Sequence, residues 1–260
     1  MENRRRCVAS RSPPRKLSRI PLLQVLSLFI ACKRCAAFCP RISGGLRTRA
    51  PTRQAVSTQD SLTPELERRR AFQENGGLIY LPRFLDYLEA MAVAQEAPAL
   101  IRRATKEHGS IARGRLVAEV PKESNIHRIF TGDQVKAALK SVAGEEEMFA
   151  SGLPVELRLY PRWSRMGWHY DDVLFARPQY EVIYTLENTS DSLTEWEDKS
   201  GARHAVSTEP NSLLVVKAGG PCRHRVTCVW QGRRVVIKAA MTPTTEAGEA
   251  LQEHLEGSYF

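Results

Sequence analysis

The stretch SLLVVKAGGPCRHRVTCVWQGRRVVIKAAM, residues 212–241, contains three short runs rich in valine and isoleucine, separated by GGPC and QG. Runs of this composition between glycine, proline and polar residues are typical of β-strands joined by turns. Comparable runs begin at residue 155 with VELRLYP and continue with YEVIYTLEN and HAVST. Their regular spacing predicts an all-β barrel or sandwich over about residues 153–242.

Helical patterns are more frequent before this β-rich part. We expect helices over residues 64–74 with Ser61 or Thr63 as the cap, from residue 87 to Gly109, and over 131–144 with Thr131 as the cap and Gly144 as the end. Short strands are predicted in LIYLPRFLD and RLVAEVP, and one more helix in residues 242–260. The predicted fold class is therefore α+β, mainly β, with N-terminal helices that flank the β core.

Residues 1–59 carry most of the positive charge. They contain thirteen Lys and Arg against one acid, whereas residues 60–260 contain 25 basic and 28 acidic residues. A mildly acidic body argues against nucleic acid as the partner. The basic charge therefore belongs to a leader rather than to a binding face.

The order of features in this leader predicts a targeting presequence over residues 1–59. An Arg-rich start precedes the apolar run Ile20–Cys32, which is thirteen residues long and too short for a membrane span of about 20 residues. CAAFCP and a tract rich in Arg, Ser and Thr follow, and together they resemble the bipartite presequences of algae with secondary plastids. We expect a plastid transit peptide, delivery by the organellar import machinery and no stable transmembrane span after processing. A mitochondrion and the secretory lumen are the alternatives.

The segment GWHYDDVLF, residues 167–175, supplies two candidate metal ligands. Residues two apart on a strand face the same side, so His169 and Asp171 can bind one ion while Trp168 and Tyr170 point away and Asp172 stays a bystander. A third ligand is available 55 residues after His169, at His224. Two histidines and one carboxylate form the facial triad of non-haem Fe(II) oxygenases, and zinc is the rival metal.

Arg234 lies ten residues after His224. An oxygenase of this type needs an electron-donating co-substrate such as 2-oxoglutarate, whose far carboxylate needs a cation. Arginine suits that role because its planar guanidinium meets a carboxylate with two hydrogen bonds and stays charged in a pocket. The neighbouring Arg233 is the alternative, but adjacent strand residues face opposite ways.

YPRWSRMGWHYDD, followed by HRVTCVWQGRR, resembles the 2-oxoglutarate/Fe(II)-dependent dioxygenase superfamily, in its prolyl 4-hydroxylase-like branch. The resemblance implies a double-stranded β-helix (jelly-roll) core in a catalytic domain over residues 60–260. It implies Fe(II) bound by His169, Asp171 and His224, with O₂, 2-oxoglutarate as co-substrate and ascorbate as a reductant. It also implies that Arg234 binds the far carboxylate of 2-oxoglutarate, and that the hydroxyls of Tyr160 and Thr185 hydrogen-bond the same co-substrate.

The implied reaction hydroxylates a substrate and releases succinate and CO₂. LENTSDSLTEWEDKSGARH stands where prolyl hydroxylases usually have an acidic, glycine-rich GGET segment, so a prolyl substrate does not follow from the resemblance. The prime substrate is expected to be a protein side chain or a small metabolite. A non-catalytic binding module with this β-helix and a zinc-dependent hydrolase on a similar barrel remain the alternative functions.

Overall fold

The structure is a computed structural model that describes residues 63–251 of the 260-residue chain. The helices are α1 (Pro64–Glu74), α2 (Tyr87–Arg103), α3 (Asn125–Phe130) and α4 (Asp133–Ala143). The strands before the predicted β core are β1 (Leu78–Leu81), β2 (Thr105–Lys106), β3 (Ala112–Arg113), β4 (Leu116–Glu119) and β5 (Phe149–Ala150). Within the core they are β6 (Glu156–Tyr160), β7 (Arg165–His169), β8 (Tyr180–Asn188), β9 (Thr194–Glu197), β10 (Arg203–Val206), β11 (Ser212–Lys217), β12 (His224–Val226) and β13 (Arg234–Thr242).

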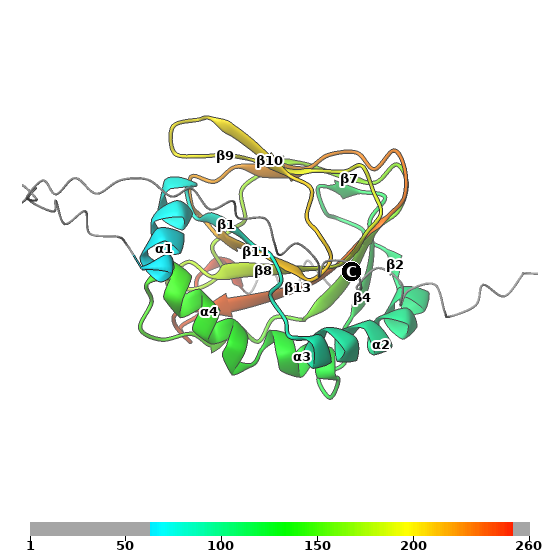
Figure 1. Cartoon of the computed structure of the whole chain (residues 1–260), viewed down its shortest axis with the longest axis horizontal. Helices are drawn as coiled ribbons and strands as arrows, with labels where there is room; N and C mark the ends of the chain where they lie inside the picture. Colours follow the sequence, from blue (N-terminus) through cyan, green and yellow to red (C-terminus); the bar gives the residue numbers. More distant parts are fainter. Residues whose placement is uncertain (1–62, 252–260) are drawn as a thin grey trace, which may run out of the picture. The chain divides into compact units, whose positions relative to one another are not determined.

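Two antiparallel sheets make up the β core (Figure 1). The larger sheet has the order β1-β11-β8-β13-β6-β4-β2, with β5 paired to β13, and the smaller has the order β10-β9-β12-β7-β3. The eight strands β6 to β13 divide equally between the two sheets: β6, β8, β11 and β13 lie in the larger sheet, and β7, β9, β10 and β12 lie in the smaller. This topology is the double-stranded β-helix, or jelly roll, and it confirms the predicted fold class; its strands β6 to β13 run from Glu156 to Thr242.

Side-chain alternation along the strands of the larger sheet separates a packed face from a pocket face. On β6, Leu157 and Leu159 are buried in the main hydrophobic cluster, whereas Arg158 and Tyr160 line a pocket between the sheets. On β13, Val235 and Ile237 join the same cluster, and Figure 1 shows α2, α3 and α4 on that side of the sheet. The period of two in the sequence therefore places alternate residues against the helices and in the pocket.

Helix α4 shows how the flanking helices attach to the sheet. Its buried residues Val135, Leu139 and Val142 recur at helical spacing and form one apolar face. It ends at Gly144, which adopts the left-handed conformation with φ of 76°, as the sequence predicted.

Three details of the predicted secondary structure were wrong. Thr131 does not cap α4, because the short helix α3, which was not predicted, ends there: the backbone N–H of Thr131 donates to His127, and Gly132 precedes α4. The second helix ends at Arg103 and not at Gly109, because the chain turns extended at Ala104 and enters β2. Strand β12 is also shorter than its sequence pattern suggested.

Other predictions about the ends of the chain stay untested. The presequence over residues 1–59 lies outside the described residues, and so do residues 252–260 of the segment 242–260 in which a helix was expected; of the described part, only residues 250 and 251 are helical. Over residues 63–251, no helix is long and apolar enough to cross a membrane.

Gly232 shapes the turn that leads into β13. Its φ is +66°, a conformation that side chains rarely adopt, and an added Cβ would collide with the backbone carbonyl of Thr189. This close approach fixes where β13 starts and therefore which of the two following arginines faces the pocket.

Candidate functional site

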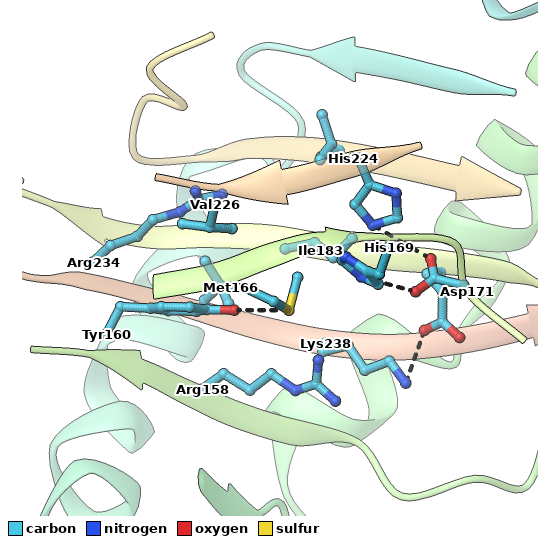
Figure 2. A pocket seen from close by; sticks show the side chains of 13 residues that line it. Arg158, Tyr160, Met166, His169, Asp171, Ile183, His224, Val226, Arg234 and Lys238 are labelled. Atoms are coloured by element: carbon cyan, nitrogen blue, oxygen red, sulfur yellow. Dashed lines mark hydrogen bonds and ion pairs between the residues drawn. The ribbon is translucent and has the colours of Figure 1, made fainter. Parts of the chain in front are cut away.

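A pocket between the two sheets brings together most of the residues singled out in the sequence (Figure 2). His169, Asp171 and His224 line it, and so do Arg234 and Tyr160. The remaining lining residues are Arg158, Met166, Glu181, Ile183, Leu214, Val226, Val236 and Lys238. Six of the eight strands of the double-stranded β-helix or their ends contribute a side chain.

The two histidines come from neighbouring strands of the smaller sheet. His169 is the last residue of β7, His224 is the first residue of β12, and the two pair directly in the antiparallel register. Their ring centroids are 4.1 Å apart. Asp171 was expected to share a strand with His169, but β7 ends at His169 and Asp171 lies in the loop beyond it. The loop nevertheless returns the carboxylate to the histidines.

The spacing of these three side chains fits one metal ion. His169 Nε2 lies 3.4 Å from Asp171 Oδ1, and His224 Nε2 lies 3.6 Å from Asp171 Oδ2. All three ligand atoms lie within 4.8 Å of one another, and no other group of three His, Cys, Asp or Glu side chains in residues 63–251 does so. An ion at about 2.1 Å from each of two ligands at right angles holds them about 3 Å apart, so small adjustments close the set around an ion.

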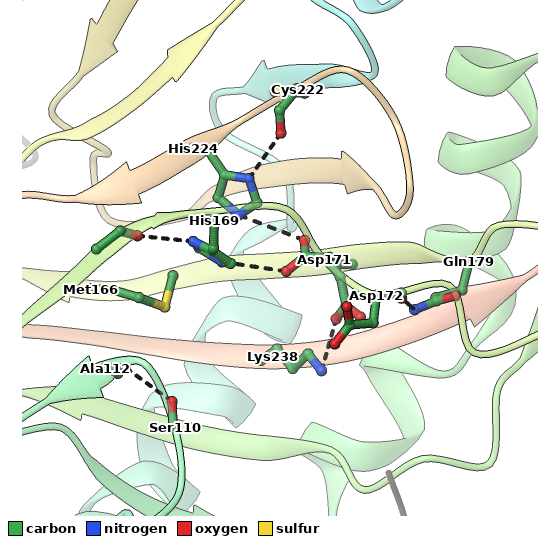
Figure 3. A network of polar contacts seen from close by, with 12 residues as sticks. Ser110, Ala112, Met166, His169, Asp171, Asp172, Gln179, Cys222, His224 and Lys238 are labelled. Atoms are coloured by element: carbon green, nitrogen blue, oxygen red, sulfur yellow. Dashed lines mark hydrogen bonds and ion pairs between the residues drawn. The ribbon is translucent and has the colours of Figure 1, made fainter. Parts of the chain in front are cut away.

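Backbone carbonyls fix the tautomer of both imidazole rings (Figure 3). His169 Nδ1 lies 3.0 Å from the carbonyl oxygen of Gly167, and His224 Nδ1 lies 3.3 Å from that of Cys222. A carbonyl can only accept, so each Nδ1 carries the proton and donates it. Each Nε2 then keeps its lone pair for a ligand, which is the form a metal needs.

The pKa values of Asp171 and His224 are both shifted in the direction that favours the metal-binding form of each side chain. Burial by itself raises the pKa of Asp171, but contact with His169 and the nearby His224 and Lys238 outweigh burial and leave that pKa below its ordinary value. Burial lowers the pKa of His224 more than Asp171 raises it. The carboxylate therefore stays ionised and the imidazole of His224 stays neutral at neutral pH.

Arg234 is a buried cation with few partners. It is the first residue of β13 and is 2% exposed. Its Nη1 donates to Thr194 Oγ1 at 2.8 Å, and its Nε has no hydrogen-bond partner among the described residues. Burial lowers the pKa of Arg234, and the nearby Tyr160 offsets this only in part. A buried guanidinium in this state has donors free to pair with an anion.

Arg233 points away from the pocket, as strand alternation predicted. Its side chain is 47% exposed and its Nη2 forms an ion pair with Glu187 Oε2 at 2.8 Å. Thr194, which the sequence analysis did not single out, is the hydroxyl that contacts Arg234. It comes from β9 in the opposite sheet, and no spacing rule links it to Arg234.

The two predicted co-substrate hydroxyls have different surroundings. Tyr160 pairs directly with Arg234 in the β6–β13 register and lines the pocket. Thr185 does not line the part of the pocket formed by the described residues, because its hydroxyl turns to Thr208 and donates to Oγ1 of that residue at 2.8 Å. In this structure the hydroxyl of Thr185 therefore contacts Thr208 and not the pocket, and its role toward the co-substrate stays a prediction.

The residues next to the triad follow the predicted orientations. The Trp168 ring lies under the guanidinium groups of Arg203, Arg223 and Arg225, with the nearest guanidinium carbon 4.8 Å from the ring centroid. Tyr170 is 55% exposed, and the side chain of Asp172 is exposed and outside the pocket. None of these three side chains approaches the triad.

Two charged pairs lie on β6, β8 and β13, and each contributes at least one side chain to the pocket wall (Figure 2). Lys238, four residues after Arg234 on β13, lies 2.8 Å from Glu181 Oε2, with both side chains largely buried. Arg158 pairs with Glu156 at 2.8 Å. The wall around the triad is therefore polar and close to neutral in charge.

No protein-family model and no curated protein matches the chain. Solved structures do match. A prolyl-4-hydroxylase from Pseudomonas putida is 16% identical with a TM-score of 0.54, and the match covers 68% of this chain and 97% of that one. A 2OG-Fe(II) oxygenase family protein from Burkholderia pseudomallei is 14% identical with a TM-score of 0.57, covering 71% and 93%. HygX from Streptomyces hygroscopicus, solved with nickel and 2-oxoglutarate bound, is 12% identical with a TM-score of 0.54, covering 71% and 88%. At these identities the likeness establishes that residues 63–251 have the fold of these oxygenases, the double-stranded β-helix.

Proposed function

We propose that this chain is an Fe(II)- and 2-oxoglutarate-dependent dioxygenase that hydroxylates its substrate and releases succinate and CO₂. The observation that carries the proposal is the presence, in one pocket, of a two-histidine, one-carboxylate set and a buried guanidinium whose Nε has no partner among residues 63–251. A zinc hydrolase needs only the first of these. A dicarboxylate that chelates the metal at one end and pairs with Arg234 at the other uses both.

Different residues along the pocket would bind the metal and the co-substrate. His169, Asp171 and His224 would hold Fe(II) on one face and leave its other positions open to the pocket. Arg234 would pair with the far carboxylate of 2-oxoglutarate and so orient its 2-oxo acid end toward the triad. Bound iron supplies the redox chemistry by which O₂ oxidises a C–H bond, with ascorbate as a reductant. The chain contributes the ligand geometry, the orientation of the co-substrate and a pocket largely screened from water.

A spectroscopic titration tests the metal and the co-substrate together. Anaerobic Fe(II) protein titrated with 2-oxoglutarate should develop a weak metal-to-ligand charge-transfer band in the visible. Asp171→Asn should abolish the band, whereas Asp172→Asn, which changes the adjacent exposed aspartate, should leave it intact. The proposal fails if the wild type shows no band or if Asp171→Asn keeps it. Activity that survives iron removal and needs no 2-oxoglutarate would instead identify a zinc-dependent hydrolase.

Turnover without a prime substrate separates an enzyme from a binding module. The iron-loaded protein should release succinate slowly when only O₂ and 2-oxoglutarate are supplied, and a module that merely binds ligands cannot do so. Absence of succinate release from a protein that binds both iron and 2-oxoglutarate would favour the binding module.

The prime substrate is proposed to be a protein side chain or a small metabolite. Two structures of this fold contain such molecules: HygX was solved with hygromycin B, and a prolyl hydroxylase from Trichoplax adhaerens with a peptide fragment. The charged pairs Lys238–Glu181 and Arg158–Glu156 support a polar substrate group near the triad. Peptide and metabolite profiling with the purified enzyme, read as mass gains of one oxygen atom, would identify it, and gains confined to purely aliphatic molecules would contradict the polar group.

We further propose that residues 1–59 act as a transit peptide that directs residues 60–260 to a plastid through its import machinery. The support is the acid-poor, basic composition and the thirteen-residue apolar run Ile20–Cys32. A fusion of residues 1–59 to a fluorescent reporter should accumulate in plastids. Accumulation in mitochondria or in the secretory lumen would contradict the proposal.

A further inference from the structure

Arg115, just before β4, is a buried arginine that no motif marks. It is 3% exposed, and it lies 45 residues before Tyr160 in the chain. Glu107 holds its guanidinium with both carboxylate oxygens, the Nη2–Oε1 distance being 2.6 Å. Nη2 also donates to Ser110 Oγ at 3.2 Å. Burial by itself lowers the pKa of Arg115, but Tyr160 and Glu107 outweigh burial and keep that pKa above its ordinary value. The side chain is thus charged and fixed from one side by a carboxylate.

The free side of this guanidinium faces the phenol of Tyr160. Nη1 of Arg115 donates to the Tyr160 hydroxyl oxygen at 2.8 Å. Arginine has five N–H donors and no acceptor, so the phenol oxygen must be the acceptor in this bond. The hydroxyl proton of Tyr160 is therefore directed away from Arg115.

Only a weak acceptor takes that proton within the described structure. Tyr160 Oη lies 3.9 Å from Met166 Sδ, and thioether sulfur accepts hydrogen bonds poorly. Tyr160 lines the pocket and pairs directly with Arg234 in the β6–β13 register. Its O–H is thus available to an oxygen atom of a ligand that binds beside Arg234.

We propose that Arg115, anchored by Glu107, is a positioning residue that holds the Tyr160 hydroxyl as a hydrogen-bond donor toward the far carboxylate of the co-substrate. This inference rests on the proposed function, because it assigns the anion beside Arg234 to 2-oxoglutarate. Arg234 and Tyr160 then offer donors from two neighbouring strands to one carboxylate. Arg115 itself touches no ligand. It acts by donating to the phenol oxygen of Tyr160, which leaves the O–H of Tyr160 to donate into the pocket.

Binding measurements on Mn(II)-loaded protein test the inference without turnover. Arg115→Met should weaken 2-oxoglutarate binding about tenfold, the loss of one charge-assisted hydrogen bond. It should leave unchanged the binding of 2-oxobutanoate, which has the 2-oxo acid end but lacks the far carboxylate. Arg113→Met, which changes an exposed arginine two residues away, is the matched control and should affect neither ligand. Isothermal titration calorimetry gives all of these affinities.

A double-mutant cycle with Tyr160→Phe separates positioning from a general structural role. Arg115→Met should cost little further 2-oxoglutarate affinity once the Tyr160 hydroxyl has been removed, because the arginine acts through that hydroxyl. In steady state, Arg115→Met should raise KM for 2-oxoglutarate and leave kcat nearly unchanged. Additive losses in the cycle, or equal weakening of 2-oxobutanoate, would overturn the inference.

The outcomes also separate this inference from the proposed function. If the wild type binds no 2-oxoglutarate, the proposed function fails; if it binds normally and Arg115→Met binds equally well, only the inference fails. Should Arg115→Met not fold, Glu107→Gln offers the same test, because it keeps the shape of the anchor and removes its charge. Glu107→Gln is then expected to weaken 2-oxoglutarate several-fold and to spare 2-oxobutanoate, and unchanged 2-oxoglutarate affinity would contradict the anchoring role.

Discussion

Replacement of Arg234 by methionine should weaken ligand binding strongly without lowering the stability of the ligand-free protein. The substitution keeps a long side chain in a site that is 2% exposed and removes a charge whose single side-chain partner in the described structure is the hydroxyl of Thr194. Arg233→Met is the matched control, since that arginine is exposed and paired with Glu187 at the surface.

The expected magnitudes follow from these contacts. A guanidinium–carboxylate pair with two charge-assisted hydrogen bonds contributes about 3 kcal/mol or more, so Arg234→Met should weaken 2-oxoglutarate binding at least about a hundredfold. In the ligand-free protein, a buried charge that is incompletely paired costs free energy that methionine does not incur. Loss of the hydrogen bond to Thr194 offsets about 1 kcal/mol of that gain. The net change in stability should be near zero or favourable, which is about 0 to +4 °C in Tm for a domain of this size.

Calorimetry of 2-oxoglutarate binding and thermal unfolding of the ligand-free protein measure the two effects. Arg233→Met should change both by little, because an exposed ion pair contributes at most about 1 kcal/mol. The reasoning is refuted if Arg234→Met lowers Tm by more than about 5 °C while weakening 2-oxoglutarate no more than Arg233→Met does. Arg234 would then be a structural cation and not an anion site.

Three further substitutions probe the fold. Glu96→Gln should cost about 1 kcal/mol at neutral pH, because the carboxylate accepts hydrogen bonds from the first backbone N–H groups of α3. Burial opposes these bonds, but together they lower the pKa of Glu96 below its ordinary value of 4.5. The stability difference between Glu96→Gln and the wild type should therefore be full at pH 7 and shrink as the pH falls below about 4.5. Urea unfolding across this pH range measures it, and a difference independent of pH would contradict the reasoning. Gly232→Ala should lower Tm clearly more than Gly201→Ala, since both glycines have positive φ but only at Gly232 does a Cβ meet backbone; equal shifts in thermal unfolding would contradict the close approach. Leu139→Ala, at a fully buried position of α4, should cost about 2–5 kcal/mol in urea unfolding, and a loss below 1 kcal/mol would show that α4 packs loosely on the sheet.

Much of the site could be predicted because its residues lie at fixed places on strands. His169 and His224 occupy facing ends of adjacent strands, and Arg234 opens the last strand directly after a turn that only glycine fits. These relations leave a regular spacing in the sequence. Asp171 was identified for a reason that proved wrong, since a loop and not strand alternation brings it to the histidines.

The contacts that the sequence did not reveal cross between segments without a shared pattern. Thr194 reaches Arg234 from the opposite sheet, and Arg115 reaches Tyr160 from a loop. Thr185 lies on the strand that follows the motif, yet its hydroxyl finds Thr208 instead of the pocket. Side-chain pairing of this kind depends on how the two sheets face each other, and neither the composition of the sequence nor its hydrophobic periodicity predicts it.

The rise in exposure along the pocket has a kinetic consequence. Arg234 is 2% exposed and the side chain of His224 6%, whereas the side chains of His169 and Asp171 are 15% and 22% exposed, so the pocket opens beside His169 and Asp171 and closes at the arginine. A dicarboxylate on its way to Arg234 must pass the metal ligands, and any molecule already seated at the opening blocks that path. For the proposed function, this geometry predicts an ordered loading: 2-oxoglutarate should enter first, the prime substrate second, and succinate should be the last product to leave. An excess of prime substrate should slow turnover by occupying enzyme that has not yet taken up 2-oxoglutarate.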